Sequence, residues 1–225
     1  MKRIIISFSF AMLLGCAVFA QEEGNNDMKT IFGRPDMQSI GGYGALNVGY
    51  TKIHDLDAIT IGARGAVVLN HNLALGLGGH GFVSEPTYDL NLAEDYEFAG
   101  GYGGIYVEPI VGWRHPVHLS FPILIGAGGI GYIKHWGNYE DDNTDDNERY
   151  DEDSNAFFVI EPGVELEFNL VKFMRLAVVG SYRYTSDVKL NYKKRLGTDF
   201  SEKSIAPADM LRGFNVGLIM KFGKF

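Results

Sequence analysis

From Gly41 onward, apolar residues alternate with Gly, Ser and charged residues at a period of two. This period is typical of strands, whose successive side chains point to opposite faces. Segments rich in turn residues divide the pattern into eight runs: 41–52, 58–70, 73–85, 98–114, 117–134, 157–169, 173–185 and 211–225. Each run reaches the roughly nine to eleven residues that a tilted strand needs to cross a bilayer. The pattern therefore predicts eight long strands.

The links between these runs alternate in length. Short turns around His71, His115-Pro116 and Leu170-Val171 join the second run to the third, the fourth to the fifth and the sixth to the seventh. The longer links are 53–57, 86–97, 135–156 and 186–210. A transmembrane barrel has tight periplasmic turns at one rim and longer loops at the other. We therefore predict an all-β fold, an eight-stranded antiparallel up-and-down transmembrane β-barrel with both ends on the periplasmic side.

The composition of the two strand faces predicts which face turns outward. In the second run, Ile59 and Ile61 alternate with Thr60, Gly62 and Arg64. Across the runs the second face is rich in Gly and Ala, which suits the crowded interior of an eight-stranded barrel. We therefore expect the apolar face to meet lipid. The aromatic residues expected in an interfacial girdle on that face are Tyr50, Trp113, Phe121, Tyr182 and Tyr184.

The few large residues on the inward face carry balanced charges. The alternation points four cations and four anions into the lumen: Arg64, Arg175, Arg183 and Lys221, with Glu108, Glu161, Glu165 and Glu167. A buried charge without a partner is costly. We therefore expect these eight residues to form a hydrogen-bonded network that plugs the lumen.

The first twenty residues have a basic start, an apolar run and small residues at their end, which is the layout of a secretory signal. The residues favour cleavage after Ala20, and the alternative is a lipobox-like site that would leave a lipidated Cys16. Cys16 is the only cysteine, so the mature fold has no disulfide. We expect a signal peptide over 1–20, an N-terminal periplasmic segment over 21–39 and the barrel over 40–225.

The net charge of −8 is concentrated in one predicted outer loop. Between Asn138 and Asn155 nine acidic residues accompany the single cation Arg149. Because no basic face exists to neutralise phosphates, nucleic acid is excluded as a partner. The residues at the offsets of a calcium loop are Asp141, Asn143, Asp145 and Glu152. Asp146 stands where such a loop needs Gly, so we favour a solvated loop and expect no metal and no cofactor.

Two pairs of residues suggest chemistry only weakly. His118 and Ser120 share a strand face, but this lone pair follows the turn at His115-Pro116, at the predicted periplasmic end, and points into the lumen. His80 and Ser84 form a second pair nearer the outer rim, and neither has an acid partner that the sequence assigns. Polar filling of the lumen is the commoner role of such residues. We therefore expect no catalytic residues. The cluster Lys193-Lys194-Arg195 in the last outer link could meet lipopolysaccharide phosphates or form a solvated loop balanced by nearby acids.

The closing run from Gly213 to Phe222, with Phe225 last, carries a family resemblance. With the signal, strand count and loop alternation, the chain resembles small outer-membrane barrels of the OmpA transmembrane-domain, OmpX and opacity-protein type. The resemblance implies location in the cell outer membrane, contact with its lipid and lipopolysaccharide, and recognition of Phe222 or Phe225 by barrel-assembly machinery. Phe222 is in phase with the lipid-facing set, and Phe225 is not.

These observations predict a non-enzymatic barrel that displays extracellular loops for adhesion, envelope integrity or surface interaction. The sequence does not identify the partner that these loops bind. The alternatives are a narrow channel or ligand conduit and, less favoured, an enzyme that modifies lipid A. A soluble lipocalin-like carrier is the rival fold, which the strand lengths and the Gly-rich face disfavour.

Overall fold

The computed structural model describes residues 39–92, 94–135, 153–192 and 204–225, all of which belong to one compact unit, Met37–Phe225. The strands are β1 Ile40–Ile53, β2 Leu56–Leu69, β3 Leu73–Ser84, β4 Thr87–Asp89, β5 Glu94–Val111, β6 Val117–Ser120, β7 Ile123–Lys134, β8 Asp153–Val171, β9 Met174–Thr185 and β10 Gly213–Lys224. Every pairing among them is antiparallel. The predicted signal peptide and N-terminal segment lie outside the described residues.

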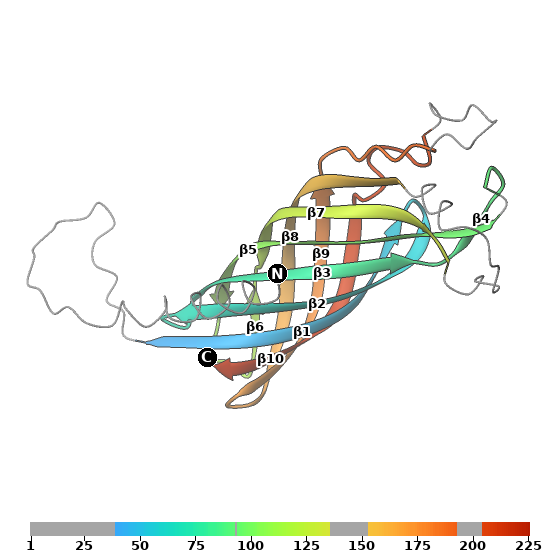
Figure 1. Ribbon diagram of the computed structural model, residues 1–225. Helices are drawn as coiled ribbons and strands as arrows, with labels where there is room; N and C mark the ends of the chain where they lie inside the picture. The colour runs from blue at the N-terminus through green and yellow to red at the C-terminus, as the bar shows by residue number, and fades with distance from the viewer. Residues whose placement is uncertain (1–38, 93, 136–152, 193–203) are drawn as a thin grey trace, which may run out of the picture. The chain divides into compact units, whose positions relative to one another are not determined.

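The sheet closes on itself. β1 pairs with β2 on one side and with β10 on the other, from Gly42↔Lys224 to Thr51↔Asn215 (Figure 1). Around the ring the order is β1, β2, β3, β5, β6 with β7, β8, β9 and β10. β6 and β7 together take one place in the ring, so the predicted eight-stranded antiparallel barrel is confirmed. Closure leaves no unpaired edge in the ring of eight strands, as a spanning sheet requires, and β4 lies outside this ring.

The fifth predicted strand is interrupted. The register of β6 on β5 and that of β7 on β5 are continuous, yet Phe121 and Pro122 between them are not part of the ladder. Pro122 has no N–H to donate, although its carbonyl still accepts from Gly163 N at 2.8 Å. The break therefore has a local chemical cause and does not shift the strand.

The links differ from the prediction in two places. The first outer link is a turn of only two residues, His54 and Asp55, because β1 and β2 pair through to Ile53↔Leu56. Both turn residues have positive φ, at 50° and 65°, as in the primed turns that suit hairpins. In the second outer link, β4 pairs with the start of β5, which begins four residues before the predicted Phe98. The predicted alternation of short and long links is therefore wrong for the first link.

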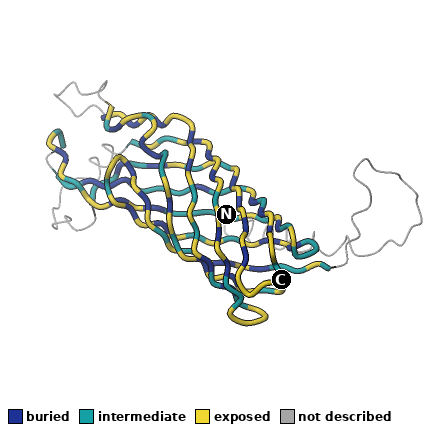
Figure 2. Tube along the Cα trace, turned by 180° about the vertical axis from the view of Figure 1, so that it is seen from behind, coloured by how far each residue is buried: buried dark blue, intermediate teal, exposed yellow. Residues whose placement is uncertain are grey.

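Burial alternates along each strand, as the blue and yellow segments in Figure 2 show. The buried side chains form two hydrophobic clusters inside the ring. The larger contains Phe82, Phe98, Tyr102, Tyr132 and Phe157 and lies toward the outer end. The smaller contains Tyr43, Val68, Ile110, Ala177 and Ile219 and lies toward the end with the short turns. The core is thus the lumen. No helix among the described residues is long and apolar enough to span a membrane.

Candidate functional site

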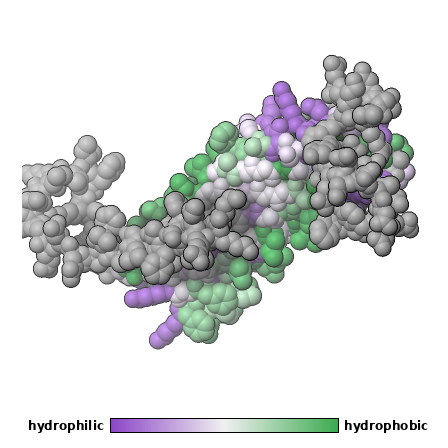
Figure 3. Space-filling view, in the orientation of Figure 1, coloured by the Kyte–Doolittle hydropathy of each residue, from purple (hydrophilic) through white to green (hydrophobic). Residues whose placement is uncertain are grey.

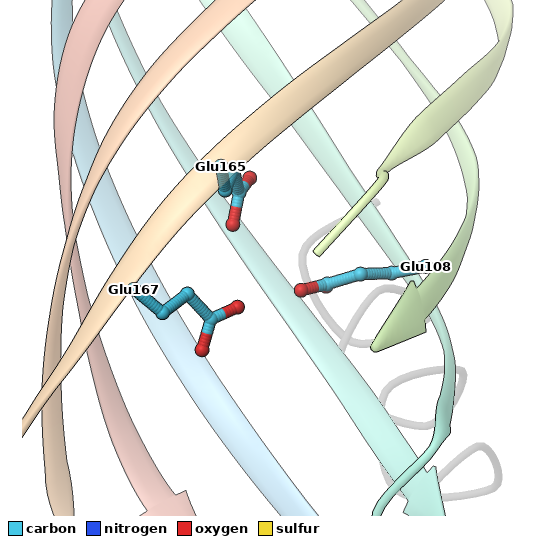
Figure 4. A group of neighbouring side chains, drawn as sticks. All are labelled: Glu108, Glu165 and Glu167. Carbon is cyan, nitrogen blue, oxygen red and sulfur yellow. The ribbon is translucent and has the colours of Figure 1, made fainter. Parts of the chain in front are cut away.

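Six of the eight inward charges predicted from the sequence meet in the half of the lumen nearer the short turns. We call this set the charge cluster: Arg64 of β2, Glu108 of β5, Glu165 and Glu167 of β8, Arg175 of β9 and Lys221 of β10. No side chain in the set is more than 7% exposed. The three carboxylates point toward one another from β5 and β8 (Figure 4).

Lys221 lies at the centre of the charge cluster. Its Nζ is 2.5 Å from Glu108 Oε1, 2.7 Å from Glu165 Oε2 and 2.6 Å from Glu167 Oε1. An ammonium group has three N–H donors, and here each has a carboxylate within reach. This arrangement joins β10 to β5 and β8 across the lumen.

Arg64 extends the charge cluster to β2. Its two terminal nitrogens each lie 2.8 Å from an oxygen of Glu165, and Nη2 is also 3.5 Å from Glu108 Oε2. The hydroxyl of Tyr43 donates to Glu108, and the guanidinium lies 5.7 Å from the centre of the Tyr43 ring. Opposite Arg64 on β3 stands Gly78, where any Cβ would clash with the Arg64 backbone and Cβ. The glycine therefore provides the room that the arginine needs.

Arg175 pairs with Glu167 at the end of the lumen near the short turns. Its Nη1 donates to Glu167 Oε2 at 3.1 Å, and its guanidinium lies 3.8 Å from the centre of the Phe225 ring. His118 Nε2 is 3.1 Å from the same carboxylate oxygen, and Ser120 donates to Glu167 Oε1 at 2.6 Å. Glu167 thus has partners from three other strands.

The carboxylates of Glu108, Glu165 and Glu167 are near enough to share a metal ion, with oxygens within 4.8 Å of one another. Lys221 Nζ, however, lies within 2.7 Å of all three, where such an ion would have to sit. The geometry therefore fits a lysine held by three carboxylates.

The other two predicted lumen charges do not join the cluster. Glu161 accepts hydrogen bonds from Tyr102, Ser181 and Asn215 at 2.5–2.6 Å. Arg183 donates from Nε to the carbonyl of Leu211 at 2.7 Å, and no carboxylate of the described residues lies within 4.0 Å of it. Glu161 and Arg183 both lie inside the barrel toward the outer end. Glu161 is satisfied by its three hydrogen bonds, whereas Nη1 and Nη2 of the buried Arg183 have no hydrogen-bond partner among the described residues.

Neither His–Ser pair has the geometry of a nucleophile and its base. Ser120 donates to Glu165 and Glu167, and no hydrogen bond joins it to His118. His80 contacts Asn47 at 3.0 Å and Tyr106 at 2.6 Å, whereas the Ser84 hydroxyl bonds to backbone groups. A nucleophile needs a base within hydrogen-bond reach. These residues therefore fill the lumen.

The outer end of the lumen is closed by the described residues of the last outer link, 186–192 and 204–212, which we call the outer plug. Its Val188, Leu190 and Leu211 are fully buried against the larger hydrophobic cluster. The backbone is held by Val188 N donating to Ala208 O and Ile205 N donating to Leu190 O, both at 2.8 Å. Between the plug and the charge cluster lies a cavity of about 40 Å³, lined by polar groups that include His80 and Glu161.

Asp89 of β4 ties the outer plug to the barrel. Its carboxylate accepts from the hydroxyls of Tyr192 at 2.7 Å and Tyr132 at 2.9 Å, and from the backbone N–H of Asn91 at 2.8 Å. Burial alone would raise the pKa of Asp89, but these hydrogen bonds outweigh it and hold the pKa below its usual value. Burial, with the bond to Asp89, raises the pKa of Tyr192 to about 12.

The two aromatic residues predicted as the assembly signal lie in different surroundings. Phe222 is exposed on the outer wall, whereas Phe225 stacks on Tyr43 with ring centres 5.8 Å apart. Trp113, which we expected in the outward girdle, instead packs on the smaller cluster and stacks on His71 at 4.3 Å. The prediction for Trp113 is wrong because its turn folds back over the mouth of the lumen. The acidic stretch 136–152 and Lys193-Lys194-Arg195 lie outside the described residues.

The outside of the barrel is an apolar belt. Its exposed side chains include Leu46, Ile61, Leu77, Ile105, Ile125, Val164, Val178 and Leu218. Figure 3 shows such side chains, in green, along the wall. Tyr50, Phe121, Tyr182 and Tyr184 are exposed as predicted. A closed barrel with an apolar exterior and a charged interior has the polarity of a protein whose solvent outside the wall is lipid.

Comparison with known structures agrees with this fold. Neisserial surface protein A shares 7% sequence identity with this chain at a TM-score of 0.52, over 83% of this chain and 97% of that one. The chain has the fold of the small outer-membrane barrels. A second match is the structure of Ail, the attachment invasion locus protein of Yersinia pestis, in complex with the heparin analogue sucrose octasulfate. It shares 10% identity with this chain at a TM-score of 0.43, over 82% of this chain and 97% of Ail.

No family model and no curated protein matches the sequence. The fold and the apolar belt together place this barrel in the cell outer membrane, and its wall contacts membrane lipid. The end that carries the three short turns and both ends of the sheet is then the periplasmic end, and the outer plug lies at the extracellular end.

Proposed function

We propose that this outer-membrane barrel is a non-enzymatic surface protein with a sealed lumen, which presents its extracellular segments for adhesion, envelope integrity or interaction with other surface components. One observation carries the proposal: the lumen is filled at two levels, by the charge cluster near the periplasmic end and by the outer plug at the other. A barrel filled in this way serves as a rigid support for what lies outside the membrane.

The two ends of the barrel support this role. The described periplasmic links are short turns. The long links, between β7 and β8 and between β9 and β10, are both at the extracellular end. The first of these segments carries most of the net negative charge of the chain. Surface segments of strongly acidic composition are hydrated and attract cationic partners.

The geometry of the two His–Ser pairs supports a non-enzymatic role, because no hydrogen bond joins His118 to Ser120 or His80 to Ser84. The candidate Ser120 donates to carboxylates inside the sealed lumen, out of reach of the lipid in which a lipid-modifying enzyme finds its substrate. The ligand-conduit alternative needs a continuous passage, whereas the lumen cavity of about 40 Å³ has room for only a few waters.

Three partners belong to this proposal. Lipopolysaccharide phosphates would meet Lys193-Lys194-Arg195 in the last outer link. Barrel-assembly machinery would read a terminal aromatic residue, and exposure favours Phe222 over Phe225, which is engaged with Tyr43 and Arg175. The extracellular partner is one that binds the loops.

Replacement of the loops tests the display role. Cells of a strain that lacks its own copy would produce the full protein or a barrel in which residues 139–152 and 193–203 are Gly-Ser segments of equal length. We expect both barrels to reach the outer membrane in equal amount. Adhesion to surfaces and resistance to detergent would be restored by the full protein alone. If the loop-replaced barrel restores the strain as well as the full protein does, the display role is wrong.

A further inference from the structure

Arg183 is a buried cation with two unused nitrogens. Its side chain is fully buried, and its Nε donates to the carbonyl of Leu211 at 2.7 Å. Nη1 and Nη2 have no hydrogen-bond partner among the described residues. A charged group that is buried with unsatisfied donors is costly, and a native structure that keeps one needs a physical reason for it.

The groups around Arg183 supply only part of that reason. Glu161 stands opposite on β8, but its oxygens already accept three other hydrogen bonds, and it balances the charge of Arg183 only at longer range. The guanidinium carbon lies 5.5 Å from the centre of the Phe82 ring and 5.7 Å from that of Tyr102, which stabilises the cation in part. These contacts leave the edge formed by Nη1 and Nη2 unused.

Thr185 adds a third unused donor on the same strand face. It is the next inward residue of β9 after Arg183, its side chain is fully buried, and its Oγ1 has no hydrogen-bond partner among the described residues. The paired N–H groups of a guanidinium edge match two oxygens of a phosphate or sulfate group, and a hydroxyl can donate to a third. The two side chains therefore carry the donors that a tetrahedral oxyanion needs.

The outer plug covers these donors from the extracellular side. Its Leu211 contacts Arg183 directly, and Thr185 is the last residue of β9 before the plug begins. The plug is held to the barrel by separate hydrogen bonds, such as that from His54 N to Met210 O at 3.2 Å, and none of its described residues belongs to the ring of strands. It can therefore open locally without breaking the wall.

We propose that Arg183 and Thr185 bind a tetrahedral oxyanion, phosphate or sulfate, from the extracellular medium when the outer plug opens. The closed plug excludes the anion, and opening exposes Nη1, Nη2 and Oγ1. Because a ligand shifts an equilibrium toward the state that it binds, the anion raises the population of the open plug. The charge cluster below stays in place, so the lumen gains a ligand site and no channel. This site acts independently of what the extracellular segments bind.

Hydrogen exchange of the plug amides provides the test. The full protein in maltoside micelles would be titrated with inorganic phosphate from about 1 to about 100 mM, at an ionic strength held constant with chloride. Exchange would be followed at the Val188 and Ile205 amides, which donate to carbonyls within the plug. A ligand of the open form multiplies its population by one plus the ratio of ligand concentration to dissociation constant, so exchange should quicken by about threefold or more. Amides of β1 and β10 should not respond.

Matched variants locate the site. Arg183→Met removes the cation and should abolish the phosphate response, whereas Lys189→Met, at an exposed cation of the plug, should keep it. Thr185→Val has nearly the same shape without the hydroxyl and should weaken the response, which keeps the test open if Arg183→Met does not fold. No response of the wild type, an equal response in Arg183→Met or in Thr185→Val, or an equal quickening by chloride alone would overturn the proposal.

Discussion

The two halves of the lumen are filled by side chains of different kinds. In the periplasmic half, charged side chains from five strands fill the section, with Lys221 shared by three carboxylates. In the extracellular half, aromatic side chains fill it, and the outer plug adds Val188, Leu190 and Leu211 from outside the sheet. Ion pairs are satisfied only in one geometry, whereas apolar contacts tolerate rearrangement. We therefore expect a periplasmic half that is fixed and an extracellular half that can loosen locally.

Loss of the central cation should have the largest effect. Lys221→Met leaves three carboxylates around an apolar side chain, and removal of one partner from a buried ion pair costs about 3–5 kcal/mol. Urea unfolding in detergent should show a loss of this size in the free energy of unfolding. Lys224→Met, on the same strand but exposed, is the control and should stay within about 0.5 kcal/mol of the wild type. Equal effects of the two substitutions would mean that the ion pairs do not hold the periplasmic half.

Truncation of the outer plug should have a smaller effect. Leu211 is fully buried, and Leu→Ala at such sites costs about 2–5 kcal/mol according to how far the site relaxes. We expect Leu211→Ala near the lower figure, because a plug outside the sheet can settle into the space. Leu90, which is 87% exposed, provides the control Leu90→Ala, which should change little. A loss larger than that of Lys221→Met would reverse the comparison of the two halves.

Removal of the Asp89 carboxylate should loosen the plug alone. Hydrogen bonds to a charged acceptor contribute about 1.5–3 kcal/mol, so Asp89→Asn should speed hydrogen exchange at the Val188 and Ile205 amides by roughly tenfold or more. Exchange within β1 and β10 should not change. Asp187→Asn, at an exposed carboxylate that pairs with Arg212, should leave these amides protected.

Acid should reproduce the effect of Asp89→Asn. The pKa of Asp89 is lower in the folded than in the unfolded chain, so its contribution is full above the unfolded pKa of about 4 and is lost as pH falls through the folded value. Exchange at Val188 should therefore quicken below about pH 4 in the wild type but not further in Asp89→Asn. An equal acid response in both proteins would show that another group is responsible.

The strands and their faces could be predicted because the alternation of apolar with small or polar residues can be seen within each strand by itself. Ile59 and Ile61 are exposed and Thr60 is buried, as the alternation of their run indicates. The composition of the inward face also predicted that small residues would make room for large ones, and Gly78 opposite Arg64 is one instance. Which carboxylate meets which cation depends instead on the stagger of eight strands, which no single run contains.

Glu161 and Arg183 illustrate this limit. They are opposite positions of β8 and β9, where the register passes unshifted from Ile160↔Tyr184 to Gly163↔Ser181 without a pairing between. Pro162 lies in this gap and has no N–H for the ladder. Glu161 turns to Tyr102 and Arg183 to Leu211, so two opposite charges on facing strands do not pair. The outer plug escaped prediction for another reason. Leu190 lies in a link where the alternation stops, and Leu211, which was predicted to begin the eighth strand, instead precedes β10, which begins at Gly213.

The sealed lumen is the central claim, and conductance across a planar bilayer tests it most directly. Purified wild-type protein, inserted at single-molecule density, should give no conductance steps above the bare bilayer under applied voltage. Stable, reproducible steps from the wild type, altered in size by Arg64→Ala, would place ions on a path through the charge cluster and contradict the account.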